Sequence, residues 1–194
     1  MSGKKVIVFL ADGTEEMEFT ITVDVLRRAQ LDVTVVGVQL AHGTYAECSR
    51  KVKIVPDVLL EHEGQSWNRS DYEAAVIPGG APGANTMKDN VEVQDIISLL
   101  YEKQKIVAFI CAGTLVAKAA KIPEGHKVTS YPGVKDQLTD VYKYSEDRVV
   151  VDQNVITSRG PGTAMLFALT IVEQLLDKQV VEKLKQEMLT ASTL

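Results

Sequence analysis

The chain has 194 residues, 45% hydrophobic and 24% charged, so it can bury the core of one α/β domain over residues 1–194. Its 21 lysine and arginine residues against 26 aspartate and glutamate residues give a net charge of −5 without a basic block, so we expect no nucleic-acid partner. Two cysteines, Cys48 and Cys111, are too few for a disulfide framework and favour a reducing, cytoplasmic setting, which leaves the nucleus open as well.

The chain opens with a buried strand and an amphipathic helix. Residues 6–10 are apolar on both faces, as in a parallel strand covered by helices, and they are too few for a signal peptide or a membrane span. The next helix is predicted to follow a Thr14 cap and to run to about Ala29, with apolar residues at helical spacing. A second strand is expected over residues 33–38.

A less regular region follows the second strand. Residues 45–50 and 52–55 alternate enough to predict a short hairpin at a sheet edge, and residues 56–70 predict a loop. A third buried strand, residues 74–77, leads into the glycine-rich segment 78–83, whose free backbone amides can approach a ligand closely. This segment lacks the lysine and the spacing of nucleotide-binding loops, so nucleotide binding is not favoured.

The second half of the chain continues the alternation of strands and helices. An amphipathic helix is expected over residues 91–103, and two helices end the chain, one through Leu176 and one over residues 177–188. The strands predicted between them are residues 106–110, 128–130, 149–151 and 155–157, the last two as a hairpin. This alternation predicts a doubly wound, mostly parallel sheet with helices on both faces.

Cys111 ends the apolar run of residues 106–110 and precedes small residues and a helix. A strand, a tight turn and a helix in this order are typical of a nucleophile elbow, where N–H groups at the helix start stabilise a thiolate and lower its pKa. Ligands of such sheets bind at the carboxyl ends of the strands, where residues 12–13, residues 79–80 and Cys111 all fall. The alternative is a buried cysteine that packs as a small hydrophobe.

A nucleophilic thiol needs a group that holds or accepts its proton, and an acidic cluster follows the first strand. Glu15 and Glu16 are expected at the surface, where they complement the helix dipole, whereas Glu18 can point inward. An exposed carboxylate is the alternative for Glu18; beside a thiolate its pKa should be raised. The three histidines have no metal-ligand spacing, so we expect no metal site, and no Cys–His dyad can be assembled.

Six segments in chain order form a known pattern. They are residues 10–18 (LADGTEEME), 23–29 (VDVLRRA), 78–80 (PGG), 110–113 (ICAG), 144–148 (YSEDR) and 157–163 (TSRGPGT). Together they resemble the ThiJ/PfpI superfamily, specifically its DJ-one branch, and the likeness covers essentially the whole chain. The resemblance implies a flavodoxin-like homodimer with a reactive cysteine and no cofactor. It also implies a glyoxalase or deglycase acting on methylglyoxal and its adducts, or an oxidative-stress sensor.

The resemblance also assigns the central residues of the site. By position, Cys111 matches the nucleophile and Glu18 matches the carboxylic acid that hydrogen-bonds it. The backbone donors around the nucleophile match Gly79, Gly80 and Ala112.

Further positions match the family's pocket and its dimer interface. Arg28, with Arg50 from the partner chain, matches basic residues that flank the pocket. The helix over residues 23–29 and the hairpin at residues 48–50 match the interface between two copies. Cys48 falls there, where packing is the expected role.

Two pocket positions depart from the family pattern. The DJ-one proteins commonly carry histidine where Tyr131 stands, so the usual auxiliary acid or base is absent, and His126 precedes the motif. Tyr131 either donates or orients in the reaction or packs beside Pro132. Proline often follows the elbow where this chain has Thr114, whose hydroxyl can bond locally and tune the thiolate.

The leading hypothesis is a glyoxalase that needs no glutathione and converts 2-oxoaldehydes such as methylglyoxal to lactate, with a Cys111 thiolate as nucleophile and Glu18 as acid and base. The alternative is a sensor or redox-regulated chaperone in which Cys111 is oxidised to sulfinate. The proteolytic activity known in PfpI relatives is disfavoured because histidine follows the nucleophile in those proteins, whereas Ala112 follows it here. A class I glutamine amidotransferase is disfavoured because no His-x-Glu stretch lies downstream.

Overall fold

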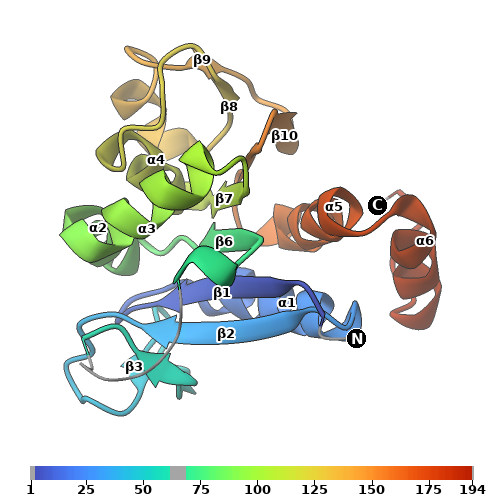
Figure 1. The fold of residues 1–194 in the computed structure, drawn as a ribbon, viewed down its shortest axis with the longest axis horizontal. Coiled ribbons are helices and arrows are strands. Elements are labelled where there is room, and N and C mark those ends of the chain that lie inside the picture. Colours follow the sequence, from blue (N-terminus) through green and yellow to red (C-terminus); the bar gives the residue numbers. More distant parts are fainter. Residues whose placement is uncertain (1–2, 62–68, 194) are drawn as a thin grey trace.

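Seven strands form one central sheet in the computed structural model, which describes residues 3–61 and 69–193 (Figure 1). The strands are β1 (Lys5–Leu10), β2 (Asp32–Gly37), β5 (Val58–Leu59), β6 (Ala74–Ile77), β7 (Ile106–Ile110), β10 (Val149–Asp152) and β11 (Val155–Ser158). Their order is β10-β11-β7-β6-β1-β2-β5, and within this sheet only the β10–β11 pair is antiparallel. The mostly parallel, doubly wound sheet predicted from the sequence is confirmed.

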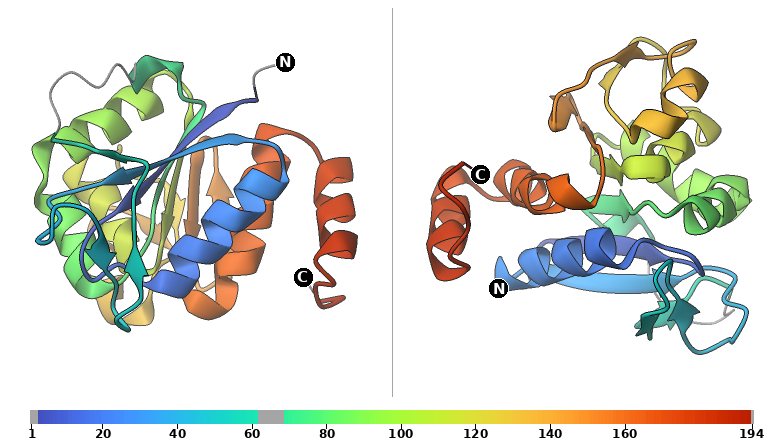
Figure 2. Two further views of the ribbon diagram at one scale, coloured as in Figure 1. Left: turned by 90° about the horizontal axis from the view of Figure 1, so that it is seen from below. Right: turned by 180° about the vertical axis from the view of Figure 1, so that it is seen from behind.

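Helices cover both faces of this sheet. They are α1 (Glu16–Arg28), α2 (Ala81–Asp89), α3 (Val91–Glu102), α4 (Leu115–Ala119), α5 (Ala164–Leu175) and α6 (Lys178–Glu187). In Figure 2, α1 and α5 lie on one face, with α6 beside α5, and the green helices α2 and α3 lie on the other. None of the helices among the described residues is long and apolar enough to cross a membrane.

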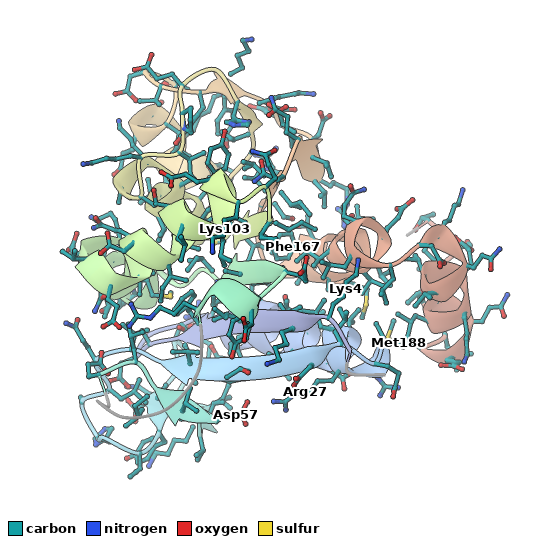
Figure 3. All side chains as sticks on the ribbon, in the orientation of Figure 1. Lys4, Arg27, Asp57, Lys103, Phe167 and Met188 are labelled. Carbon is teal, nitrogen blue, oxygen red and sulfur yellow. The ribbon has the colours of Figure 1, made fainter. Side chains whose placement is uncertain are left out.

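The alternation of side chains along β1 explains these two layers. Val6 and Val8 belong to the apolar core beneath α1 and α5. Ile7 and Phe9 belong to the core beneath α2, α3 and α4. All four side chains are fully buried, as the apolar run over residues 6–10 predicted. From α5, Phe167 fills the first of these cores and is also fully buried (Figure 3).

Asp57 anchors the edge strand β5, which lies in the segment predicted as a loop over residues 56–70. Its carboxylate accepts a hydrogen bond from the Val35 N–H at 2.8 Å and from the Arg27 guanidinium at 2.9 Å. Figure 3 labels Arg27 and Asp57 below β2. The loop prediction is therefore wrong at β5, which pairs in parallel with β2. Two residues are too few to show a strand pattern.

Two further predictions differ from the structure in their sheet partners. The predicted hairpin forms, as β3 (Ala46–Glu47) and β4 (Lys53–Ile54), but it is a separate two-stranded sheet rather than part of the edge of the large one. The strand predicted at residues 128–130 is shorter, as β8 (Lys127–Val128), and pairs with β9 (Lys143–Tyr144) in a third sheet. Pairing partners depend on contacts distant in sequence, which local alternation does not encode.

The start of α1 places the acidic cluster next to the sheet. Glu15, rather than the predicted Thr14, caps the helix, because its carboxylate accepts a hydrogen bond from the Glu18 N–H at 2.8 Å. The Thr14 hydroxyl oxygen instead accepts a hydrogen bond from the Ala11 N–H at 3.1 Å. Glu18 consequently lies in the first turn of α1 on the buried side of the helix, with no exposed surface.

Candidate active site

Cys111 lies at a sharp turn between β7 and α4. β7 ends at Ile110, Cys111 opens the short 3₁₀ helix η2 (Cys111–Thr114), and α4 follows directly. Cys111 has a φ of 62°, a left-handed conformation whose cost is about 1–3 kcal/mol for a residue other than glycine and which is concentrated at active sites. Gly113 permits the turn, since a Cβ there would lie 2.6 Å from the Pro78 carbonyl oxygen. The strand, turn and helix predicted around Cys111 are confirmed.

Glu18 and Cys111 meet across Gly79. The Glu18 Oε2 atom accepts a hydrogen bond from the Gly79 N–H at 2.7 Å, and the same carboxyl group interacts with the Cys111 thiol. A Cβ on Gly79 would lie 2.5 Å from both Glu18 Oε2 and Cys111 Cβ, so any larger residue would separate the pair. Glu18 Oε1 is buried without a hydrogen-bond partner among the described residues. The prediction that Glu18 points inward is therefore confirmed over the alternative of an exposed carboxylate.

Burial dominates the protonation of this pair. It raises the pKa of Glu18 to about 7, although hydrogen bonds from the Gly79 N–H and the Cys111 thiol oppose the increase. Burial, followed by the charge of Glu18, raises the pKa of Cys111 to about 12, while the Ala112 and Gly80 N–H groups act in the opposite direction. The raised pKa of Glu18 is thus confirmed. The low pKa expected for Cys111 is wrong, because desolvation of the thiol and the charge of Glu18 outweigh the N–H groups that favour the thiolate.

The backbone N–H groups around the thiol divide into two roles. Those of Ala112 and Gly80 face the Cys111 sulfur and favour its negative charge, as the resemblance implied. The Gly79 N–H is instead bonded to Glu18, so the expectation that it acts as a donor to the nucleophile is wrong. Gly80 can turn its N–H inward because its φ is 86°, and a Cβ there would lie 2.2 Å from the Gly13 carbonyl oxygen.

A cavity of about 760 Å³ opens above the pair. The residues that line it are Glu15, Glu18, Ser49, Arg50, Gly80, Ala81, Pro82, Cys111, Ala112, Tyr131, Gly133, Val134 and Pro161. This volume suits a small-molecule ligand. Of the three loops predicted to converge, those at Gly80 and Cys111 line the cavity, whereas Gly13 lies against Gly80 and Pro82 without lining it. The described part of the chain holds no cluster of three His, Cys, Asp or Glu side chains that could bind a metal.

The structure brings two of the four predicted pocket residues to the cavity. Arg50 and Tyr131 line it, and Arg50 does so from the same chain as Cys111. Arg28 does not line it within one chain, because its Nε donates to Asp24 at 2.8 Å on the outer side of α1. Thr114 is fully buried behind the elbow, where its hydroxyl donates to the Thr129 carbonyl oxygen at 3.2 Å. The prediction that Thr114 belongs to the pocket is therefore wrong.

Glu16 anchors Ser49 and Arg50, which line the cavity, and the sequence did not reveal this role. Its two carboxylate oxygens accept hydrogen bonds from the Ser49 hydroxyl and the Arg50 N–H, both at 2.7 Å. The surface position expected for Glu16 is therefore wrong, since only 8% of the residue is exposed. No sequence signal connects residues so far apart in the chain, so only the folded hairpin shows this contact.

The histidines take other places. His126 is buried between the Tyr101 hydroxyl, 2.9 Å from Nε2, and the Asp152 carboxylate, 3.2 Å from Nδ1. His42 stacks on a tyrosine ring, and neither histidine lines the cavity. His62 lies outside the described residues. Of the side chains described at the cavity, Glu18 is therefore the base within reach of the thiol.

Comparisons with known proteins agree with this geometry. The model of the DJ-1/PfpI family matches residues 4–174. The chain is 44% identical to a Parkinson disease protein 7 homolog from Danio rerio, over 95% of this chain and 96% of the relative, and 37% identical to the glutathione-independent glyoxalase DJ-1 of Schizosaccharomyces pombe, over 90% and 92%. The crystal structure of Drosophila melanogaster DJ-1beta superposes with a TM-score of 0.89 at 42% identity, covering 97% of this chain and 99% of the other. A buried cysteine and glutamate on this fold, together with these matches, show that the chain belongs to the DJ-1/PfpI family.

Proposed function

We propose that this protein is a glyoxalase that converts methylglyoxal and related 2-oxoaldehydes to 2-hydroxy acids with its own side chains, without glutathione. The contact of Cys111 and Glu18 across Gly79, at the floor of a cavity of about 760 Å³, carries the proposal. Relatives in Schizosaccharomyces pombe and Caenorhabditis elegans, at 37% and 35% identity, bear the name glutathione-independent glyoxalase and support it. Deglycation of methylglyoxal adducts is an extension of the same chemistry, because the adduct releases a 2-oxoaldehyde.

The first step is attack of the Cys111 sulfur on the aldehyde carbon. The thiol proton passes to the Glu18 carboxylate, whose pKa of about 7 suits a base that works near neutral pH. The C=O double bond becomes an alkoxide, which the Gly80 and Ala112 N–H groups stabilise. Glu18 then protonates the alkoxide and leaves a hemithioacetal with a free hydroxyl group.

The second step moves hydrogen within the bound molecule. Glu18 removes the proton from C1 to form an enediolate and returns it to C2, while the C1 hydroxyl proton passes to the oxygen of C2. The product is a thioester of the 2-hydroxy acid on Cys111. Water then cleaves the thioester, which releases lactate and restores the thiol. Methylglyoxal plus water equals lactic acid, so the reaction needs no external oxidant or reductant.

The test is chiral analysis of lactate after incubation of methylglyoxal with the wild type, Cys111→Ser and Cys48→Ser. We expect one lactate enantiomer from the wild type and from Cys48→Ser, a matched control because Cys48 is buried and does not line the cavity. Cys111→Ser should form none, because the nucleophile is lost. Equal lactate from Cys111→Ser would refute the mechanism, and none from the wild type would refute the function.

A redox sensor is the second candidate. The structure of Toxoplasma gondii DJ-1, 31% identical to this chain, is described as oxidized. An oxygen added to the Cys111 sulfur would meet the Gly80 and Ala112 N–H groups that already face it. Wild-type protein that forms no lactate, yet gains two oxygen atoms at Cys111 in dilute peroxide, would favour this candidate over the glyoxalase.

We also propose that the protein is a homodimer whose interface includes α1 and the β3–β4 hairpin. Met17 of α1 is 53% exposed, and Val52 and Val55 of the hairpin are 48% and 72% exposed, so apolar side chains gather on the elements that the family resemblance places at the interface. Light scattering at micromolar concentration should report twice the chain mass of 21.2 kDa. A value near one chain mass would contradict the proposal.

A further inference from the structure

A second groove, of about 410 Å³, lies beside the active-site cavity. Tyr131 and Pro161 line both spaces. Gly160 lines the groove and also borders the catalytic pair, since a Cβ there would lie 3.9 Å from the Tyr131 Cδ2 atom and 4.0 Å from Glu18 Oε1. A ligand that starts at Cys111 can therefore continue past Gly160 into this groove.

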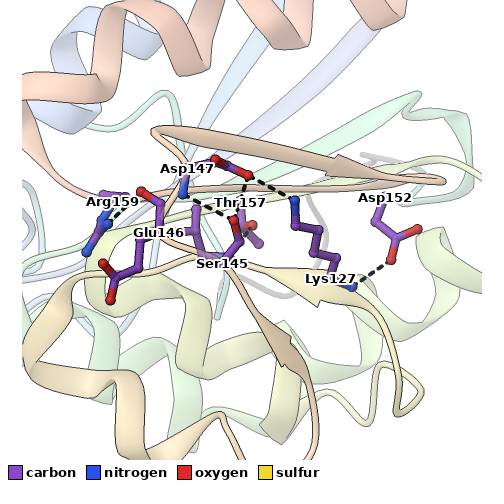
Figure 4. Close-up of polar contacts among 8 residues, drawn as sticks. Lys127, Ser145, Glu146, Asp147, Asp152, Thr157 and Arg159 are labelled. Carbon is purple, nitrogen blue, oxygen red and sulfur yellow. Dashed lines mark hydrogen bonds and ion pairs between the residues drawn. The ribbon is translucent and has the colours of Figure 1, made fainter.

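Two arginines hold their guanidinium groups at the groove. Arg148, just before β10, donates from Nη2 to the Gly162 carbonyl oxygen at 2.8 Å. Arg159, just after β11, donates from Nη1 to the Glu146 carbonyl oxygen at 2.7 Å (Figure 4). Neither guanidinium forms an ion pair with a carboxylate among the described residues. Each arginine is thus fixed by a backbone contact and keeps donors for a ligand.

The acidic groups near these arginines form ion pairs with lysines, and the charge of Arg159 also helps to lower the pKa of Glu146. The Glu146 carboxylate, which lines the groove, pairs with Lys135 at 2.9 Å. The Asp147 carboxylate pairs with Lys127 at 2.9 Å and accepts a hydrogen bond from the Ser145 hydroxyl (Figure 4). The groove is lined by two arginines and one glutamate, so its lining carries more positive than negative charge on a chain whose net charge is −5, and it favours an anion.

We propose that this groove binds the carboxylate end of 2-oxoaldehydes longer than methylglyoxal, a substrate class that rests on the glyoxalase function proposed above. The aldehyde carbon bonds Cys111, the carbon chain passes Tyr131 and Gly160, and the carboxylate meets Arg159 and Arg148. The planar guanidinium fork matches a carboxylate in two parallel hydrogen bonds. The chemistry is unchanged: substrate plus water yields a 2-hydroxy acid, which here carries a second carboxylate.

The test compares two probes of nearly equal size, 4,5-dioxopentanoate and its uncharged methyl ester. We expect the wild type to show a kcat/KM about tenfold higher for the anion, through a lower KM, because only the anion makes charge-assisted hydrogen bonds to the arginines. Arg159→Gln should reduce this ratio about tenfold, and Arg148→Gln should act in the same direction. Arg159→Lys, which keeps the charge without the fork, should give an intermediate ratio. Lys183→Gln, an equal charge change on an exposed residue of α6, should keep the wild-type ratio.

The possible results separate this proposal from the glyoxalase itself. If the ratio of kcat/KM for the anion to that for the ester keeps its wild-type value in both Arg159→Gln and Arg148→Gln, the proposal that the groove binds the carboxylate is refuted. A wild type that does not turn over methylglyoxal overturns the glyoxalase alone. Calorimetry with 4-oxopentanoate, which lacks the aldehyde, then tests the groove without catalysis: about tenfold weaker binding to Arg159→Gln supports it, and equal binding overturns it.

Discussion

Replacement of Glu18 by glutamine is expected to reduce the kcat/KM for methylglyoxal by about 10²- to 10⁴-fold, the usual contribution of a general acid or base. Glutamine keeps an oxygen that can accept the Gly79 N–H bond, so the fold around the thiol is preserved. It cannot take the proton of Cys111 or carry one from C1 to C2. Steady-state kinetics with methylglyoxal measure the effect, and the exposed Glu102→Gln is the matched control. A Glu18→Gln enzyme with wild-type activity would remove Glu18 from the mechanism.

The pH dependence of wild-type glyoxalase activity should report the ionisation of Glu18. Below the Glu18 pKa of about 7, both the carboxyl and the thiol are protonated, and no base is available. Activity should therefore increase about tenfold per pH unit up to about pH 7 and level off above it, where the pair holds one proton. The plateau extends to high pH because the pKa of Cys111 is raised to about 12. A profile that is flat between pH 5 and 8 would contradict this assignment.

The second large effect concerns stability, because Glu18→Gln should increase the free energy of unfolding at neutral and higher pH. The folded state holds the Glu18 proton with a pKa of about 7, whereas the ordinary value in the unfolded chain is 4.5. Between these values the folded protein binds more protons than the unfolded chain, so the free energy of unfolding falls as pH rises. The loss reaches about 3 kcal/mol above pH 7. Glutamine cannot ionise, so the variant avoids this loss.

Urea unfolding at pH 4.5 and pH 8 measures this difference. We expect Glu18→Gln to exceed the wild type by about 3 kcal/mol at pH 8 and by little at pH 4.5, where the wild-type carboxyl is also largely neutral. Glu102→Gln, at an exposed position, should leave the pH dependence of the wild type unchanged. A gain that is the same at both pH values, or a variant less stable at pH 8, would contradict ionisation of a buried Glu18. A confirmed gain would mean that the active site lowers stability in order to hold a base.

The sequence alone determined the local framework of this site. An apolar run followed by a cysteine and small residues predicts a strand, a turn and a helix, because backbone preference and burial act over a few neighbouring residues. The elbow at Cys111 was predicted for this reason, and so was the parallel order implied by alternating strands and helices. For Glu18, the pattern left both an inward and an exposed side chain open, and the family resemblance assigned it as the partner of the thiol.

Only the tertiary structure decided what lies around the thiol. The sequence could not show that the β3–β4 hairpin folds over Glu16 and brings Arg50 to the cavity, since that contact joins residues more than 30 positions apart. It could not show that Thr114 is turned away from the pocket. The pKa of Cys111 was mispredicted for the same reason: a helix start acts locally and is visible in sequence. Desolvation depends on every segment packed around the sulfur, so it exists only once the chain has folded.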